Sequence, residues 1–217
     1  MARMHKDWRE KLWIEFKRDK STKLDLIASV QQPEDDTYEE LEAGDADELR
    51  LDKHTATEAN LTRLLAQVTA FDKSRNHTPL LKLEISKVLI TQNKANLLAQ
   101  ILTLPNCEIT DLVMNKCRAK SDKMGLIFGA LAKNKSVANL SLKGTNIPRD
   151  SLTDLVDMLG SSRSLKMLTL FNAGLSENAI MTLAPGFEQN HGLIYLDLRQ
   201  NTFENEGFQK LAASITG

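Results

Sequence analysis

One pattern of apolar residues recurs at a fixed spacing through most of the chain. In its last copy, residues 193–203, apolar side chains stand at offsets 0, 3, 5 and 10, and an asparagine, Asn201, stands at offset 8. The frame begins with a period of 28–29 residues at Leu80, Ile109, Val137, Leu165 and Leu193. A period of this length predicts a solenoid, because one such unit can bury its apolar face only against neighbouring units.

The frame resembles the leucine-rich repeat, and its period, with a predicted helix in each unit, is similar to that of the ribonuclease-inhibitor-type subfamily. This resemblance implies an α/β solenoid, a right-handed horseshoe or arc with parallel strands on the concave inner face and helices outside. One column departs from the family pattern. Offset 8, which the family usually fills with asparagine or cysteine, reads Val88, Cys117, Thr145, Ala173 and Asn201. We therefore expect only part of the hydrogen-bonded ladder that this column makes with turn backbone.

Period-2 pairs of apolar residues predict the strands, at 24/26, 49/51, 83/85, 112/114, 140/142, 168/170 and 196/198. Segments with helical spacing follow at 58–71, 94–102, 123–132, 149–159, 177–187 and 205–215. Each begins behind residues that cap helices well, such as Thr57 before the first. The pair at 24/26 is interpreted as a first, degenerate repeat.

The N-terminal part of the chain has a different character. Trp8, Leu12, Trp13 and Phe16 form one apolar stripe of a predicted helix over residues 5–20. We interpret this helix as a cap on the solenoid core; a basic amphipathic helix for a membrane surface or a partner is the alternative. Residues 33–48 contain no basic residue and predict either a solvated segment or a docking site for a basic partner.

These features divide the chain into 1–48, a capping helix with an acidic, degenerate-repeat segment, and 49–217, the repeat array. The chain ends at its last predicted helix without an evident polar cap. We therefore expect either a truncated chain or an end that a partner or a second copy covers.

Composition and motifs exclude several classes of function. The formal net charge of −1 gives no global attraction for nucleic acid or an anionic membrane. Cys107 and Cys117 are too few for a disulfide framework and favour a cytoplasmic protein, in its own cell or delivered into a host cell. No apolar run reaches membrane-spanning length. The sequence has no phosphate-binding glycine loop, zinc-spaced ligand cluster or nucleophile elbow, so we expect no enzyme activity, cofactor or metal.

The candidate site lies on the concave face, where side chains at offsets 2, 4, 6 and 7 should point outward. In the last two units this prediction exposes Met167, Phe171 and Tyr195 on neighbouring strands. An apolar cluster edged by cations has the composition of a protein-binding hot spot. The predicted protein-binding residues are Met167, Phe171, Tyr195, Arg199, Lys143, Asp197, Asp111 and Glu84.

The sequence thus predicts a module, such as an effector or adaptor, that binds a protein partner rather than nucleic acid or a membrane. Two alternatives stay open at this point. The apolar groups could pack on each other or under a further C-terminal segment. The chain could instead regulate a partner enzyme, as GTPase activators and inhibitors of this repeat type do.

Overall fold

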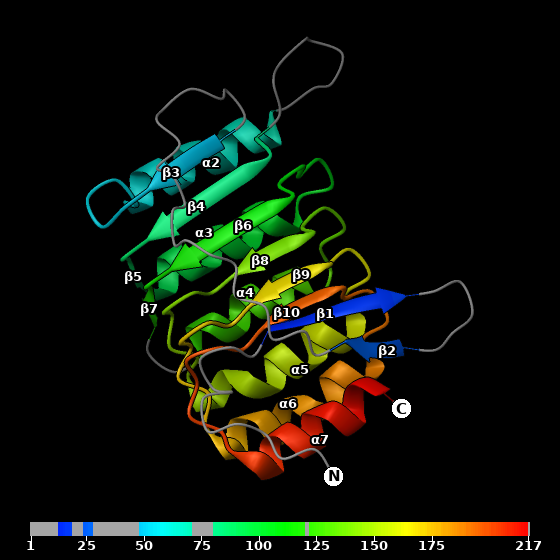
Figure 1. Cartoon of the computed structure of the whole chain (residues 1–217). Helices are drawn as coiled ribbons and strands as arrows, with labels where there is room; N and C mark the ends of the chain where they lie inside the picture. Colours follow the sequence, from blue (N-terminus) through cyan, green and yellow to red (C-terminus); the bar gives the residue numbers. More distant parts are fainter. Residues whose placement is uncertain (1–12, 19–23, 28–47, 71–79, 120–121, 217) are drawn as a thin grey trace.

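The computed structural model describes residues 13–18, 24–27, 48–70, 80–119 and 122–216. Parallel strands from successive units stand side by side in one sheet (Figure 1). In sheet order these are β3 (Glu48–Leu51), β4 (Lys82–Ser86), β6 (Asp111–Asn115), β8 (Asn139–Ser141), β9 (Met167–Thr169) and β10 (Tyr195–Asp197). A second, two-stranded sheet pairs β5 (Leu89–Ile90) with β7 (Arg118–Ala119).

Helices cover one face of the large sheet, and none of the helices of the described residues lies on the other face (Figure 1). They are α2 (Glu58–Thr69), α3 (Gln92–Thr103), α4 (Lys123–Leu131), the short 3-10 helix η2 (Arg149–Ser151), α5 (Leu152–Ser161), α6 (Glu177–Gln189) and α7 (Asn205–Thr216). Each α-helix packs against the next one along the chain. Thr57 caps α2 as predicted, because its hydroxyl accepts a hydrogen bond from the backbone N–H of Asn60 at 3.2 Å.

The register of the sheet confirms the repeated frame. Residues at equal offsets are direct neighbours on adjacent strands, as in the row Leu83, Leu112, Leu140, Leu168 and Leu196. These five leucines are each at most 1% exposed. Side chains alternate across a strand, so the leucines face the helices and the residues between them face away. The described residues therefore form an α/β structure that is compatible with a leucine-rich-repeat type fold.

The hydrogen-bonded ladder at offset 8 is partial, as the sequence predicts. The Asn201 amide spans two units: its Nδ2 donates to the carbonyls of Leu170 and Leu198 at 2.8 Å each, and its Oδ1 accepts from Ala173 and Leu175 at 3.0 Å each. The Thr145 hydroxyl accepts from the backbone N–H of Cys117 at 2.9 Å and donates to a carbonyl. Val88 and Ala173 are buried in the same column and have no polar side chain to contribute.

A second ladder lies in the turns that enter the strands. Asn134 and Asn190 are buried, and each donates from Nδ2 to the last turn of an earlier helix, at the carbonyls of Leu102 (2.7 Å) and Leu159 (2.6 Å). Asn106 makes the same kind of contact with the end of α2. With Ser162, these residues form a column at 106, 134, 162 and 190, spaced by 28 residues. This polar column lies outside the repeated apolar frame, although it has the same 28-residue period.

The N-terminal segment differs from its prediction. Residues 13–18, expected in a helix, form strand β1 (Trp13–Arg18), which pairs antiparallel with β10. The physical reason is that β10 would otherwise leave an open edge of backbone donors and acceptors, and aromatic and β-branched residues such as those of β1 suit a strand. Residues 5–12 and 19–20 of the predicted helix lie outside the described residues.

The pair at 24/26 is also a strand, β2 (Leu24–Ile27), but it is not a first repeat beside β3. It pairs antiparallel with β1 at the opposite end of the sheet, and it contacts α7. The edge of β10 in the last unit is therefore covered by the chain's own N-terminal strands. The acidic stretch, residues 33–47, lies outside the described residues.

Candidate functional site

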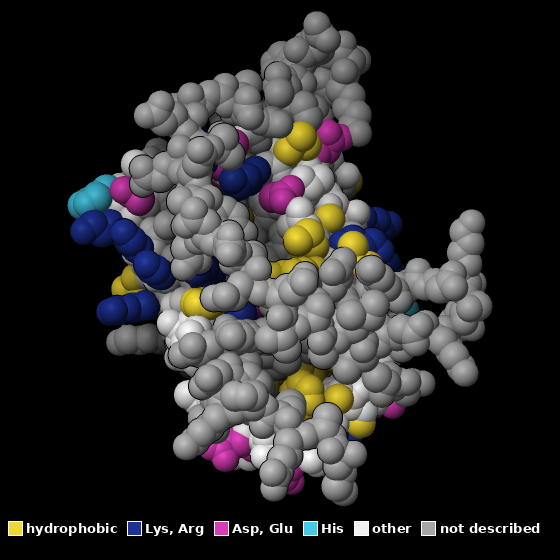
Figure 2. All heavy atoms as spheres, viewed as in Figure 1, with side chains coloured by type: hydrophobic (Ala, Val, Ile, Leu, Met, Phe, Trp, Pro, Cys, Tyr) yellow, Lys and Arg dark blue, Asp and Glu magenta, His cyan; other side chains and the backbone are white. Residues whose placement is uncertain are grey.

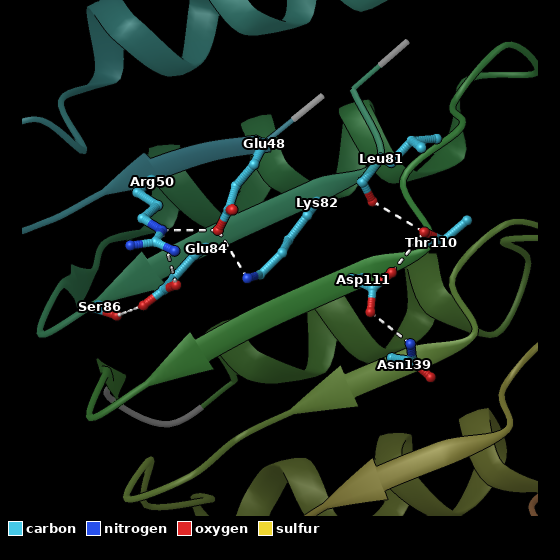
Figure 3. Close-up of polar contacts among 9 residues, drawn as sticks. All are labelled: Glu48, Arg50, Leu81, Lys82, Glu84, Ser86, Thr110, Asp111 and Asn139. Carbon is cyan, nitrogen blue, oxygen red and sulfur yellow. Dashed lines mark hydrogen bonds and ion pairs between the residues drawn. The ribbon is translucent and has the colours of Figure 1, made fainter. Parts of the chain in front are cut away.

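The open face, by which we mean the face of the large sheet opposite the helices, has two different halves. On β3 and β4 its charges are paired with each other (Figure 3). Glu48 binds Arg50 and Lys82 at 2.8 Å each, and Arg50 lies 3.7 Å from Glu84. Hydrogen bonds from Arg50 and then Lys82 hold the pKa of the Glu48 carboxyl below its usual value.

Two predicted site residues, Glu84 on β4 and Asp111 on the adjacent strand β6, also have partners within the chain. Glu84 accepts a hydrogen bond from the Ser86 hydroxyl at 2.8 Å. Asp111 accepts from the Thr110 hydroxyl at 2.6 Å and from the Asn139 amide at 2.5 Å (Figure 3). Both carboxylates are half-buried and satisfied by neighbours in the same chain, so each is less available to a partner than an unpaired surface carboxylate.

The other half carries what we call the aromatic–cation cluster: Lys143, Met167, Phe171, Tyr195 and Arg199. The Phe171 ring lies between two cations, with Lys143 Nζ 5.1 Å and Arg199 Cζ 5.5 Å from its centroid. Both distances are within the range of favourable cation–π contacts. Met167 is 40% exposed and Tyr195 half-buried, and the two are register neighbours on β9 and β10, as the sequence predicts.

Asp197 does not have the exposed position that the strand alternation predicts. It is only 3% exposed, and its carboxylate binds the Arg199 guanidinium through two hydrogen bonds, at 3.0 Å to Nε and 2.9 Å to Nη2. The backbone N–H of Arg199 also donates to Asp197 at 3.0 Å. Strand β1 also lies next to Asp197, with Trp13 as its register partner, whereas residues 5–20 were predicted to form a helix. Asp197 is thus a positioning residue for Arg199.

Offset 7, expected to point outward from a strand, is instead a turn in the left-handed backbone region. Lys87, Lys116, Gly144, Asn172 and Gln200 all have positive φ, between 49° and 66°. The strand alternation has ended by this position, so its side chains lie along the carboxyl edge of the sheet. Glycine adopts this conformation freely, whereas a lysine pays roughly 1–2 kcal/mol for it.

At the same edge, the end of β3 is fixed by a turn around Asp52. The Asp52 carboxylate accepts hydrogen bonds from the backbone N–H groups of His54 and Thr55 and from the Thr55 hydroxyl, at 2.8–2.9 Å. These donors, Thr55 above all, lower the pKa of Asp52 to about 2. Asp52 and Thr55, with Arg50, Glu84 and others, line a cavity of about 350 Å³ on the first strands.

Three further properties of the described residues bear on metal binding, thiol chemistry and membrane insertion. Among them, no three His, Cys, Asp or Glu side chains gather closely enough to hold a metal ion. Burial raises the pKa of the Cys117 thiol, which disfavours the thiolate that a nucleophile requires. Within the same part of the chain, no helix combines the length and apolar character needed to cross a lipid bilayer.

Comparison with known proteins gives distant relatives. No family model matches the sequence. The chain is 25% identical over 157 residues to NACHT, LRR and PYD domains-containing protein 4E of Mus musculus, covering 72% of this chain and 16% of that protein. It is 26% identical over 137 residues to NACHT, LRR and PYD domains-containing protein 12 of Homo sapiens, covering 63% and 13%. It is 28% identical over 107 residues to leucine-rich repeat-containing protein 45 of Gallus gallus, covering 48% and 16%.

The chain therefore spans less than a fifth of the length of each of these relatives. The names of these relatives all refer to leucine-rich repeats. The present chain has a repeated apolar frame, and residues at equal offsets of this frame are register partners on adjacent strands. Sequence similarity, repeat frame and parallel sheet together support a leucine-rich-repeat type of protein at low identity.

Proposed function

We propose that the chain is a protein-interaction module without catalytic activity of its own. It binds a folded protein partner on the open face through the aromatic–cation cluster. The observation that carries this proposal is the Phe171 ring, held between Lys143 and Arg199 in the same unit as the exposed Met167. The names of the relatives, which contain leucine-rich repeats, are consistent with such a module.

The contrast between the two halves of the open face favours the cluster as the contact area. Charges on β3 and β4 are already paired within the chain, and exposed ion pairs of this kind contribute little, typically under about 1 kcal/mol. A methionine, two aromatic rings and an arginine are the residue types that dominate binding energy in protein interfaces. The cluster therefore offers a partner more free energy per buried residue than the paired half does.

The cluster is also held in place before a partner arrives. Asp197 fixes the guanidinium of Arg199 with two hydrogen bonds, and Arg199 in turn lies over Phe171. Side chains that are already ordered lose less conformational entropy on binding, so a larger part of the contact energy becomes affinity. Asp197→Asn should weaken this arrangement while leaving the exposed surface of the cluster unchanged.

We propose further that the strand–helix units stack as a solenoid arc of the ribonuclease-inhibitor type, with the open face concave. A cytoplasmic effector or adaptor is the context that we favour. Cys107 and Cys117 are both free and buried, and unpaired cysteines of this kind suit a reducing compartment.

The test is affinity capture from cell lysate, with wild type compared with a Met167→Glu/Lys143→Glu variant. Met181→Glu is a matched control, because Met181 is 36% exposed on α6 whereas Met167 is 40% exposed on the open face. Circular dichroism and urea unfolding establish that each variant folds. We expect the double variant to lose partners that both the wild type and the control retain, with affinities at least tenfold weaker in titrations with the purified partner.

Two outcomes would count against the cluster. If the double variant retains all partners, the open face near Met167 is not the contact area. If Met181→Glu abolishes capture while the double variant does not, the helix-covered side binds the partner.

A further inference from the structure

A second surface lies at the carboxyl edge of the sheet, outside the aromatic–cation cluster. We call Lys87, Leu89, Lys116 and Arg118 the edge strip. Two neighbouring units bring them together: the N–H of Lys87 donates to the carbonyl of Asn115 at 2.8 Å, and Leu89 and Arg118 are register partners in the small sheet. Figure 2 shows Lys and Arg side chains gathered on the left side of the molecule, where Figure 1 places β5 and β7.

The three cations of the edge strip are exposed, and no carboxylate in the described part of the chain forms an ion pair with any of them. Two carboxylates at the starts of α2 and α4 have other partners. Glu58 accepts hydrogen bonds from Thr91 and Asn93, and Asp122 binds Lys123 at 3.0 Å. The strip is therefore a local excess of positive charge on a chain whose formal net charge is −1.

Leu89 adds an apolar contact within this basic surface. It is 54% exposed, the highest value among the large hydrophobic side chains of the described residues. The other residue of its short strand, Ile90, is only 1% exposed, so β5 buries one side chain and presents the other. A partner that covered Leu89 would bring its own groups next to Arg118.

The backbone conformation also brings the two lysines of the edge strip together. Lys87 and Lys116 have φ values of 59° and 53°, although the equivalent position of the next unit is Gly144. All five units of the column have this left-handed turn, which places their offset-7 residues in a line along the edge. In this conformation the two lysines stand side by side on consecutive units at the edge.

We propose that the edge strip binds an acidic protein segment in which an aliphatic or aromatic residue is flanked by aspartates or glutamates. The apolar residue packs on Leu89, and the flanking carboxylates pair with Lys87, Lys116 and Arg118. Charge complementarity selects this occupant, because three cations without carboxylate partners surround one apolar side chain. The strip shares no residue with the aromatic–cation cluster, so this proposal is independent of the proposed function.

The test uses the whole chain and a fluorescein-labelled synthetic peptide of glutamates around a central leucine, followed by fluorescence anisotropy. An analogue with serine in place of leucine and a lysine-for-glutamate analogue are the control peptides. We expect binding of the Glu/Leu peptide that weakens about tenfold in Lys87→Glu/Lys116→Glu, in Leu89→Ser, and on raising salt from about 0.05 to 0.5 M. The Lys87→Arg/Lys116→Arg variant should retain binding, since it preserves the charge.

The matched control is Lys133→Glu/Lys135→Glu, which makes the same charge change at two exposed lysines before β8, at the other edge of the sheet. An equal loss in this control would overturn the proposal, because attraction would then be general rather than local. Absence of binding by the wild type, or binding to phosphatidylserine vesicles in place of the peptide, would also overturn it.

Discussion

Asn201 provides the sharpest test of how the units are joined. Four hydrogen bonds of its amide reach buried turn backbone, two as donor at 2.8 Å and two as acceptor at 3.0 Å, and a fifth, at 3.4 Å, reaches the half-buried carbonyl of Arg199. The side chain is 7% exposed, so Asn201→Ala would leave these four backbone groups without partners and with little access to water. At about 1 kcal/mol for each hydrogen bond, the expected loss in free energy of unfolding is about 3–4 kcal/mol.

The assay is urea unfolding at neutral pH, followed by circular dichroism. Thr145→Val is the internal comparison, because it removes one hydroxyl that bonds two backbone groups in the same column and keeps the side-chain shape. Its expected loss is about half as large, roughly 1.5–2 kcal/mol. Gln209→Ala, at an exposed position on α7, should change the free energy of unfolding by less than about 0.5 kcal/mol.

A loss below about 1 kcal/mol for Asn201→Ala, or a loss no larger than that of Thr145→Val, would refute this reasoning. Either result would mean that the turns find other partners for their backbone groups. The hydrogen bonds of the ladder would then be a consequence of how the units pack, and would contribute little to the free energy of unfolding.

Three further predictions follow from the turns and the core. The pKa of Asp52 is depressed to about 2, chiefly by the N–H of Thr55, so its stabilising effect is present above the ordinary value of 3.8 and is lost as the pH falls toward 2. Asp52→Asn should therefore flatten the decline of unfolding free energy on acidification, measured by urea titrations at several pH values. Gly144→Ala should destabilise the fold by about 1 kcal/mol, whereas Gln200→Gly, also at positive φ, should be neutral or stabilising by up to about 1 kcal/mol in thermal unfolding. Cys117, buried and with a raised pKa, should react with a thiol reagent such as DTNB only at the rate of unfolding; fast labelling of the native chain would contradict its burial.

The aromatic–cation cluster shows which positions of site residues strand alternation predicts correctly and which it does not. Met167 and Tyr195 are separated by one repeat period, which predicts that they are neighbours on adjacent strands. The register of β9 and β10 confirms this prediction. The same alternation predicted an exposed Asp197, which is buried and bound to Arg199. The predicted and observed exposures of Asp197 differ because strand alternation gives the face of the sheet on which a side chain lies, but not which other residues cover that face.

Offset 7 was misplaced for a related reason. The alternation of side chains was extended to offset 7 as if the strand continued to that position. The strand has ended before it, and the backbone of Lys87 and Lys116 is in the left-handed region. Gly144 and Asn172 are the two residues in that column whose type signals such a turn. The exposed basic edge therefore became visible only when the backbone conformation was known.

The repeat, its register and its buried leucines follow from the spacing of apolar residues alone, because burial of one face on every unit imposes a regular period on the chain. The sequence also determined that the offset-8 ladder would be incomplete, since hydrogen bonding there depends on the residue type alone. Only the tertiary structure decided that β1 pairs with β10, at the far end of the sheet from β3. That pairing joins opposite ends of the described chain through backbone hydrogen bonds, and any sequence with strand propensity can make such bonds, so no spacing of residues encodes it.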